Sequence, residues 1–214
     1  MAPMTPDKVR ERMLAVRRPL PPPPAWLRPE RLPEGVPIER PAAPRTARPA
    51  AALVLVYPGP DGDAWLVLTQ RVEYGGDHSG EVSLPGGKVD PDDADAAATA
   101  LREAREEVGL DLDRDGIDVV GLLDALWIPP SNFRVEPVVA IAARRPRFVP
   151  DRREVAAILE APVTAFMPEV APMIVDPDPL GRPLRYGAYM VEGQIVWGAT
   201  AAILGQFGAV LAKQ

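Results

Sequence analysis

Residues 86–110 read GGKVDPDDADAAATALREAREEVGL, and this stretch decides the fold. Its second half predicts a helix over residues 94–108, because alanine and glutamate are good helix formers. Gly109 is expected to end the helix in the left-handed conformation. At about 100° per residue, one face of this helix is apolar and is expected to be buried. That face carries Ala97, Leu101, Ala104 and Val108.

Three carboxylates, Glu103, Glu106 and Glu107, share another face of the same helix. Like charges at this spacing repel by about 0.2–0.5 kcal/mol per pair, and the last turns of a helix disfavour anions. A bound divalent cation would remove this repulsion, which predicts a metal site. The alternative is a solvated acidic face of the kind that many surface helices carry.

The loop before the helix is the second feature of the stretch. Paired glycines at Gly86 and Gly87 let the backbone approach a ligand closely, so a carbonyl there is a candidate ligand for the same metal. The aspartates Asp90, Asp92 and Asp93 follow. For Asp92 and Asp93 the alternative role is structural, since aspartate caps a helix N-terminus and complements its dipole.

The composition of the 214-residue chain limits the chemistry. There is no cysteine and a single histidine, His78, so thiolate and multi-histidine metal sites are excluded. Any metal would be held by oxygen, which favours hard cations such as magnesium or manganese. The net charge of −6 argues against a nucleic-acid binder, which would present a basic face.

The sequence contains no feature that predicts a membrane protein. The N-terminus has no apolar core of a signal peptide, and no apolar run approaches the roughly 18 residues of a membrane span. We therefore expect a soluble cytoplasmic protein whose partner is a small nucleotide, not a nucleic acid or a membrane.

Two regions are predicted. Residues 1–50 form an arm with a short helix over residues 6–16, followed by a proline-rich segment that is expected to be extended. The proline-rich segment is interpreted as an arm packed along its own domain or along a second copy. The alternative is a docking peptide for another partner. Residues 51–214 form the globular domain.

Within the globular domain the pattern predicts mixed α/β layers, not a doubly wound sheet. Apolar runs at 51–57 and 64–71, joined through Gly59-Pro60-Asp61-Gly62, predict a hairpin. Residues 154–159 are compatible with strand or helix. The other predicted elements are strands near 81–84, 119–128 and 133–143, a hairpin at 184–190 and 194–196, and a closing helix at 197–213.

Gly87, Arg102-Glu103-Ala104, Glu106-Glu107 and Gly109-Leu110 resemble the Nudix box, usually written GX5EX7REUXEEXGU. The second half matches every fixed position of the box. In the first half the glycine stands one residue early, and Asp93 replaces the expected glutamate. This lengthened form is typical of the coenzyme A pyrophosphatase branch of the family.

A second signature of that branch, LLTxR(S/A)xxxRxxxGxxxFPGG, is kept in spacing from residue 67 to residue 87. Val72, Gly76 and Leu84 depart from it. Gly76 replaces an arginine, whose bidentate contacts to phosphate glycine cannot supply. Residues 135–139 and 195–201 also resemble this branch.

The resemblance implies an alpha-beta-alpha sandwich with a mixed sheet, together with the roles of the site residues. Magnesium or manganese would be held by Gly87, Glu103, Glu106 and Glu107. Arg102 would orient a carboxylate by a bidentate pair. The general base would be Glu106, or less favourably Glu154.

The resemblance also implies a substrate. Hydrolysis of coenzyme A or its thioesters would give 3′,5′-ADP and (acyl-)4′-phosphopantetheine. Arg71, His78 and Lys88 are candidates for substrate binding. The alternatives are a surface ion pair for Arg71 and a capped turn for His78.

Alternative functions stay open at this point. They are hydrolysis of ADP-ribose or of a dinucleoside polyphosphate, and a non-catalytic ligand-binding module. The intact set of Arg102 and the three glutamates favours an enzyme. A homodimer that uses the N-terminal arm is a further expectation.

Overall fold

A computed structural model describes residues 3–39, 41–73, 80–176 and 182–213. The predicted substrate residue His78 and the departure at Gly76 lie outside the described residues. Among the described helices, none combines the length and the apolarity that crossing a membrane requires.

The centre of the fold is an eight-stranded mixed sheet in the order β10-β4-β3-β9-β7, with β5 paired to β4, β6 to β3 and β8 to β9. The strands are β3 (Arg48–Pro58), β4 (Ala64–Arg71), β5 (Val82–Ser83), β6 (Gly86–Lys88), β7 (Ile117–Leu122), β8 (Leu126–Ile128), β9 (Phe133–Ala142) and β10 (Val155–Pro162). Strands β3 and β9 are parallel, and the other pairs are antiparallel.

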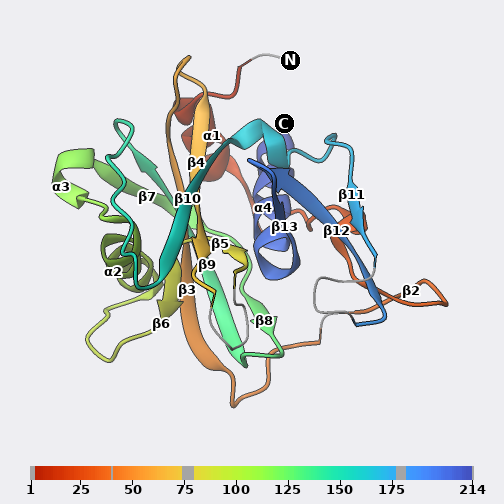
Figure 1. The fold of residues 1–214 in the computed structure, drawn as a ribbon. Coiled ribbons are helices and arrows are strands. Elements are labelled where there is room, and N and C mark those ends of the chain that lie inside the picture. Colours follow the sequence, from red (N-terminus) through yellow and green to blue (C-terminus); the bar gives the residue numbers. More distant parts are fainter. Residues whose placement is uncertain (1–2, 40, 74–79, 177–181, 214) are drawn as a thin grey trace.

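Helices cover both faces of this sheet (Figure 1), which confirms the predicted α/β sandwich. Helix α2 (Ala96–Val108) and the short α3 (Leu112–Asp115) lie on one side, and α1 (Pro6–Ala15) and α4 (Gly198–Ala212) on the other. Strand β3 is buried on both faces. Leu53 and Leu55 belong to the core under α2, whereas Val54 and Val56 belong to the core under α1 and α4. This alternation is what the two-residue period of a strand requires.

The predicted hairpin is confirmed, with Val56 opposite Leu66 and Tyr57 opposite Trp65 in β3 and β4. Residues 154–159, which were compatible with either element, belong largely to strand β10. That strand runs antiparallel to β4, and its buried Val155, Leu159 and Ala161 complete the core at this edge.

The predicted helix after the glycine loop is two residues shorter than expected. Helix α2 begins at Ala96, and Asp95 caps it by accepting a 2.8 Å bond from the Ala98 amide. Neither Asp92 nor Asp93 is the cap, which corrects the capping role considered for them. Gly109 ends the helix at φ +67° as predicted.

The buried face of α2 is also rotated from the prediction. Ala100, Ala104 and Val108 are fully buried, while Ala97 and Leu101 are only partly buried. Because the helix turns this face to the sheet, the carboxylate of Glu107 is drawn inward beside Val108.

A second, five-stranded sheet joins the two ends of the chain. Its order is β11-β12-β1-β2, with β13 paired to β12. The strands are β1 (Glu30–Arg31), β2 (Val36–Pro37), β11 (Met173–Val175), β12 (Leu184–Val191) and β13 (Gln194–Val196), and single 3₁₀ turns η1 (Ala25–Leu27) and η2 (Val163–Phe166) precede the arm strands and β11. The late hairpin β12–β13 and the closing helix α4 are as predicted.

The described arm residues pack along the chain itself. The Trp26 ring meets Tyr189 edge-on, with ring centroids 5.1 Å apart. A Cβ at Gly187 would fall 2.2 Å from the Trp26 carbonyl oxygen, so the arm backbone passes directly over β12. Farther back, the Arg12 guanidinium donates to the Leu211 carbonyl of α4. Strand β3 already begins at Arg48, just before the expected domain boundary.

Candidate functional site

The candidate site lies where the glycine loop passes between the central sheet and α2. Strand β6 places Gly87 opposite Ala51 and Gly86 opposite Ala52 of β3. The Leu53 amide also donates to the Pro85 carbonyl at 2.8 Å, which anchors the entry to the loop. The loop is therefore held in the sheet beside β3, where α2 packs against it.

Both positions of the loop require glycine, because neighbouring atoms lie too close to the backbone to leave room for a Cβ. A Cβ at Gly86 would lie 2.4 Å from the Ala51 carbonyl oxygen, well inside any real contact distance. A Cβ at Gly87 would lie 2.5 Å from the carboxyl carbon of Glu103. The Glu103 carboxylate consequently rests directly on the backbone of Gly87.

Glu107 is the most buried acidic group of the site, at 5% exposure. Its Oε2 accepts a 3.1 Å bond from the Gly86 amide. Burial raises the pKa of Glu107 to about 7, against the opposing effects of that amide and of the Arg71 charge. The charges of Glu103 and Glu154 raise the pKa further, which places these carboxyls in one electrostatic neighbourhood.

Glu103 lies beside it, with a side chain that is 15% exposed. Burial raises the pKa of Glu103, and Arg102 partly offsets this effect by donating to Oε1 at 2.9 Å. Negative charge from Glu106 and Glu154 adds to the rise in pKa. The loop thus faces an excess of negative charge that one arginine only partly balances.

Arg102 organises the carboxylates around it. Its Nε and Nη2 donate to the two oxygens of Asp93 at 3.1 and 3.0 Å, a bidentate pair. Its Nη1 reaches Glu103 and, at 3.4 Å, Glu106, while Nη2 also donates to the Lys88 carbonyl at 3.1 Å. The guanidinium therefore ties the end of the loop to the helix.

Asp93 is the residue of the candidate site whose contacts sequence reasoning missed. Besides Arg102, it accepts 2.9 Å bonds from the Asp90 amide and the Thr99 hydroxyl. The Arg102 bonds, with the Asp90 amide, hold the pKa of Asp93 far below its ordinary range. The sequence pattern could not show that Asp93 pairs with Arg102, because the two residues are nine positions apart and lie on different elements. Only the family pattern indicated that an acidic residue is expected at position 93.

The remaining predicted residues surround this centre. Glu106 is exposed and turned toward Arg102. Glu154 is exposed just before β10, and its carbonyl accepts from the Val72 amide at 3.0 Å. Lys88 presents an exposed side chain at the end of β6. These positions bring Glu106 and Glu154 to the edge of the buried carboxylates. The Lys88 carbonyl accepts from Arg102, and the Lys88 side chain is exposed.

Arg71 stands at the end of β4, close enough to Glu107 for its charge to lower the pKa of that carboxyl. Its Nε is buried and has no hydrogen-bond partner among the described residues. A buried donor without a partner is costly, so this N–H group is suited to donate to an acceptor atom of a ligand.

The donor set fits a hard cation in its chemistry, since it consists of carboxylate and carbonyl oxygens around uncompensated negative charge. In the described part of the chain, however, no three acidic or histidine side chains converge as a formed metal site. Glu106 in particular is engaged by Arg102 at 3.4 Å.

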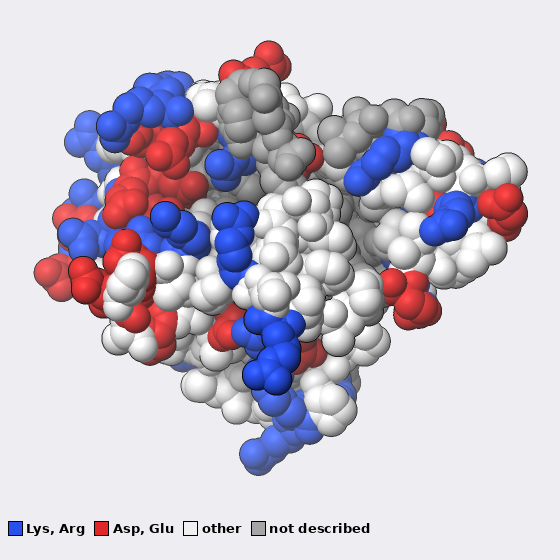
Figure 2. Space-filling model, turned by 90° about the horizontal axis from the view of Figure 1, so that it is seen from below, with Lys and Arg blue, Asp and Glu red and all other residues white. Residues whose placement is uncertain are grey.

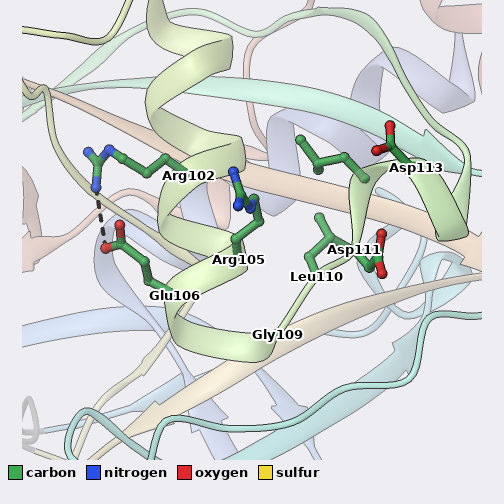
Figure 3. Close-up of a pocket in the computed structure, with 8 residues that line it drawn as sticks. Arg102, Arg105, Glu106, Gly109, Leu110, Asp111 and Asp113 are labelled. Atoms are coloured by element: carbon green, nitrogen blue, oxygen red, sulfur yellow. Dashed lines mark hydrogen bonds and ion pairs between the residues drawn. The ribbon is translucent and has the colours of Figure 1, made fainter.

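A hollow of about 700 Å³ opens on the outer side of α2 (Figure 3). Arg102, Arg105 and Glu106 line it from the helix, and residues 109–113 line it from the following turn. Glu103 and Glu107 do not line it, so it borders the site without containing the buried carboxylates. Seen from below, acidic and basic side chains lie interleaved on one side of the molecule (Figure 2), and no broad face of one sign is visible there.

The chain is similar to a family model, to curated relatives and to solved structures. The NUDIX domain model matches residues 46–168. Nudix hydrolase 15, mitochondrial, of Arabidopsis thaliana is 37% identical over 161 residues, which is 72% of this chain and 55% of the relative. The protein named uncharacterized Nudix hydrolase NudL of Pectobacterium atrosepticum is 37% identical over 165 residues, 74% of this chain and 80% of that protein.

Nudix hydrolase 22, chloroplastic, of Arabidopsis thaliana is 39% identical over 170 residues, 76% of this chain and 55% of the relative. The chain thus spans about half the length of the two plant relatives. Among solved structures, the Nudix hydrolase RenU of M. smegmatis has a TM-score of 0.46 at 23% identity, covering 63% of this chain and 78% of that one.

Proposed function

Because the chain belongs to the Nudix family, we propose that it hydrolyses a diphosphate bond in a nucleoside diphosphate derivative, most favourably coenzyme A or its thioesters. The observation that carries this proposal is the arrangement of Glu103 and Glu107 of α2 against Gly87 and Gly86, with Arg102 holding Glu103. Glu107 costs stability when it is charged and buried, which favours a functional role for this pair of carboxylates beside the glycine loop.

Magnesium or manganese is the proposed cofactor. Glu103, Glu106 and Glu107 would hold it, together with the Gly87 carbonyl. When bound, a divalent cation neutralises diphosphate oxygens and acidifies a water molecule. Glu106 is exposed, and its 3.4 Å bond is the longest of the bonds that Arg102 makes to carboxylates. We therefore expect the Glu106 side chain to be able to turn toward the loop.

A carboxylate of the chain would act as general base and accept the proton of the attacking water. Glu106 is the first candidate and Glu154 the second, since both are exposed at the edge of the buried pair. Water adds to one phosphorus atom, the bridging P–O bond breaks, and the products from coenzyme A are 3′,5′-ADP and 4′-phosphopantetheine. Arg102 keeps Glu103 in place through the Asp93 pair.

Substrate binding is proposed for Arg71 above all. Its buried Nε lacks an acceptor, and a phosphate oxygen is the acceptor that a guanidinium matches best. Lys88 is a weaker candidate, because its side chain is exposed at the end of β6. His78 stays a prediction outside the described residues.

Coenzyme A is favoured over other substrates by the signature that runs from residue 67 to residue 87. In the fold this signature spans the end of β4, β5 and β6, which are the elements that border the site. ADP-ribose and dinucleoside polyphosphates remain the alternative substrates. A non-catalytic module is disfavoured because Arg102 and the three glutamates are all present.

A substrate panel tests this proposal. Purified protein is incubated with coenzyme A, acetyl-coenzyme A, ADP-ribose and a dinucleoside polyphosphate, each with magnesium and with manganese, and the products are separated. We expect the fastest cleavage with the coenzyme A compounds. Brisk cleavage of another member without turnover of coenzyme A would overturn the substrate while sparing the enzyme class.

The matched variant for the panel is Arg71→Lys, which keeps the charge but cannot form a bidentate contact. We expect a higher KM for the coenzyme A compounds with a smaller change in kcat. An unchanged KM would remove Arg71 from the substrate-binding residues.

Oligomeric state and location are two further predictions. A homodimer through the N-terminal arm is tested by light scattering on the full chain. The cytoplasmic location is tested by fractionation, and the names of the two plant relatives place those proteins in mitochondria and chloroplasts.

A further inference from the structure

The segments on either side of the matched family domain fold together. Residues before 46 and after 168 supply α1, η1, β1 and β2 on one side and β11, β12, β13 and α4 on the other. The second sheet joins the two, and Gln206 of α4 donates to the Pro21 carbonyl of the arm at 3.3 Å. We call the described residues of these two segments the flanking lobe.

The flanking lobe meets the family domain beside the strand that leads to the glycine loop. The Thr200 hydroxyl of α4 donates to the Val82 carbonyl of β5 at 3.2 Å. Gln70 at the end of β4 donates to Gln194 of β13 at 3.4 Å. Figure 1 shows β13 and α4 next to β5, so the lobe forms a wall near Arg71, the residue that follows Gln70.

Trp197 lies at this junction, immediately before α4, and its side chain is partly exposed. Its ring meets the ring of Tyr186 edge-on, with centroids 5.3 Å apart and planes 70° apart. Tyr186 is itself buried, and its hydroxyl accepts from Arg182 at 2.8 Å. The indole is thus held by Tyr186 through an edge-on contact and keeps part of its surface exposed.

The other tryptophans are engaged elsewhere. Trp26 packs edge-on against Tyr189 inside the lobe, and Trp65 covers Gly59 at the far end of β4. Trp127 on β8 donates to the Asn132 side chain, and β8 and β9 lie on the opposite side of β3 from β6. Trp197 is therefore the tryptophan that stands at the contact between the lobe and β5.

We infer that Trp197 is the platform on which the purine base of the substrate stacks, with Tyr186 as its positioning residue. This inference rests on the proposed function, because it gives the nucleoside half of a diphosphate substrate its place beside the carboxylates. Stacking on an aromatic ring suits any base and contributes about tenfold or more to affinity. It also gives the flanking lobe a role in selecting nucleoside substrates.

Tryptophan fluorescence tests the platform without catalysis. The full chain is titrated with 3′,5′-ADP in metal-free buffer, as wild type, Trp197→Phe and Trp127→Phe. We expect saturable quenching in wild type and Trp127→Phe and its loss in Trp197→Phe. Equal quenching in all three proteins, or none in wild type, would overturn the assignment.

Steady-state kinetics supplies the second readout. Trp197→Ala should raise KM for coenzyme A about tenfold or more with little change in kcat, and Trp197→Phe should restore most of the affinity because it keeps an aromatic face. An unchanged KM in a folded Trp197→Ala protein would contradict the platform. Failure of wild type to cleave any member of the panel would instead defeat the proposed function and leave the fluorescence result to decide on Trp197.

Discussion

At the scale of single residues, the site depends on how one arginine distributes its donors. Arg102 gives two parallel bonds to Asp93 and further bonds to Glu103, Glu106 and the Lys88 carbonyl. Asp93 is paired with Arg102, so we expect it to act on the site through that guanidinium. A carboxylate on the loop can hold Arg102 although the helix begins only at Ala96, because the loop folds back along the helix.

Asp93→Asn should therefore impair catalysis without destroying the fold. It removes one charge and one acceptor from the bidentate pair, and supporting partners of this kind typically change activity about 10- to 100-fold. The measurement is kcat on the best panel substrate, with Asp92→Asn as the matched control, because Asp92 is exposed. Equal activity of the two variants would show that the Arg102 network does not need Asp93.

Glu107 makes stability depend on pH. Its pKa is about 7 in the folded chain, against an ordinary value of 4.5, mainly because of burial. The folded state binds more protons than the unfolded state between these two values, so the free energy of unfolding falls as the pH rises through this window. We expect metal-free wild type to lose about 3 kcal/mol across it, since each pH unit contributes about 1.4 kcal/mol.

Chemical denaturation in steps from pH 4.5 to pH 7 measures this loss, with Glu107→Gln as the matched control. The variant has no charge to bury and should show a flatter curve. Magnesium should restore the stability of wild type at the upper end and have little effect on the variant. Parallel curves for both proteins would contradict the assignment of the raised pKa to Glu107.

At the scale of elements, the sequence predicted what is local and missed what is distant. Gly59-Pro60-Asp61-Gly62 between two apolar runs was sufficient to predict the β3–β4 hairpin, since turn and strands are neighbours in sequence. Strands β1 and β2 have two residues each and pair with β12 and with one another. So short a strand has no periodicity to detect, and its partner lies far along the chain.

In the site, too, the sequence predicted the local relations and missed those between distant segments. Helical spacing placed Glu103, Glu106 and Glu107 together, because that relation lies within one element. The burial of Glu107 and its bond to the Gly86 amide depend on the pairing of β6 with β3, which no pattern within residues 86–110 contains. The resemblance supplied Arg71 as a candidate, and the structure adds its buried Nε without a partner.

Helix α4 offers a test of packing at this scale. A Cβ at Gly208 would fall 1.9 Å from the Phe166 carbonyl oxygen of η2, which is backbone. We expect Gly208→Ala to lower the free energy of unfolding by about 1–3 kcal/mol through overpacking. Chemical denaturation measures the change.

The matched control is Gly205→Ala in the same helix. Its closest contact would be the tip of the Leu27 side chain at 2.3 Å, a flexible group that can move aside. Alanine also favours a helix over glycine by about 1 kcal/mol, which offsets part of any cost. A Gly208→Ala protein as stable as the Gly205→Ala protein would contradict the close packing of α4 on η2.

At the scale of the whole molecule, the beginning and the end of the described chain stabilise one another. The arm contributes Val9, Met13, Leu20 and Leu27 to the core that α4 shares. Each such side chain stabilises the fold by about 1.5–3 kcal/mol when buried, so together they rival the 5–15 kcal/mol that typically stabilises a domain.

Removal of residues 1–45 should consequently abolish cooperative unfolding, because it uncovers α4 and β12. Thermal unfolding followed by circular dichroism measures this, with the full chain as reference. A truncated protein that melts cooperatively near the temperature of the full chain would show that the arm is dispensable. It would then also reopen the docking-peptide interpretation of the proline-rich segment.

The central claim is that carboxylates of α2 support metal-dependent cleavage of the coenzyme A diphosphate. The most direct measurement is turnover of coenzyme A by wild type and Glu107→Gln, with and without manganese. We expect 3′,5′-ADP and 4′-phosphopantetheine from wild type only when the metal is present, and a loss of turnover by orders of magnitude in a folded Glu107→Gln protein. Equal rates for the two proteins, or turnover that persists in a chelator, would contradict the claim.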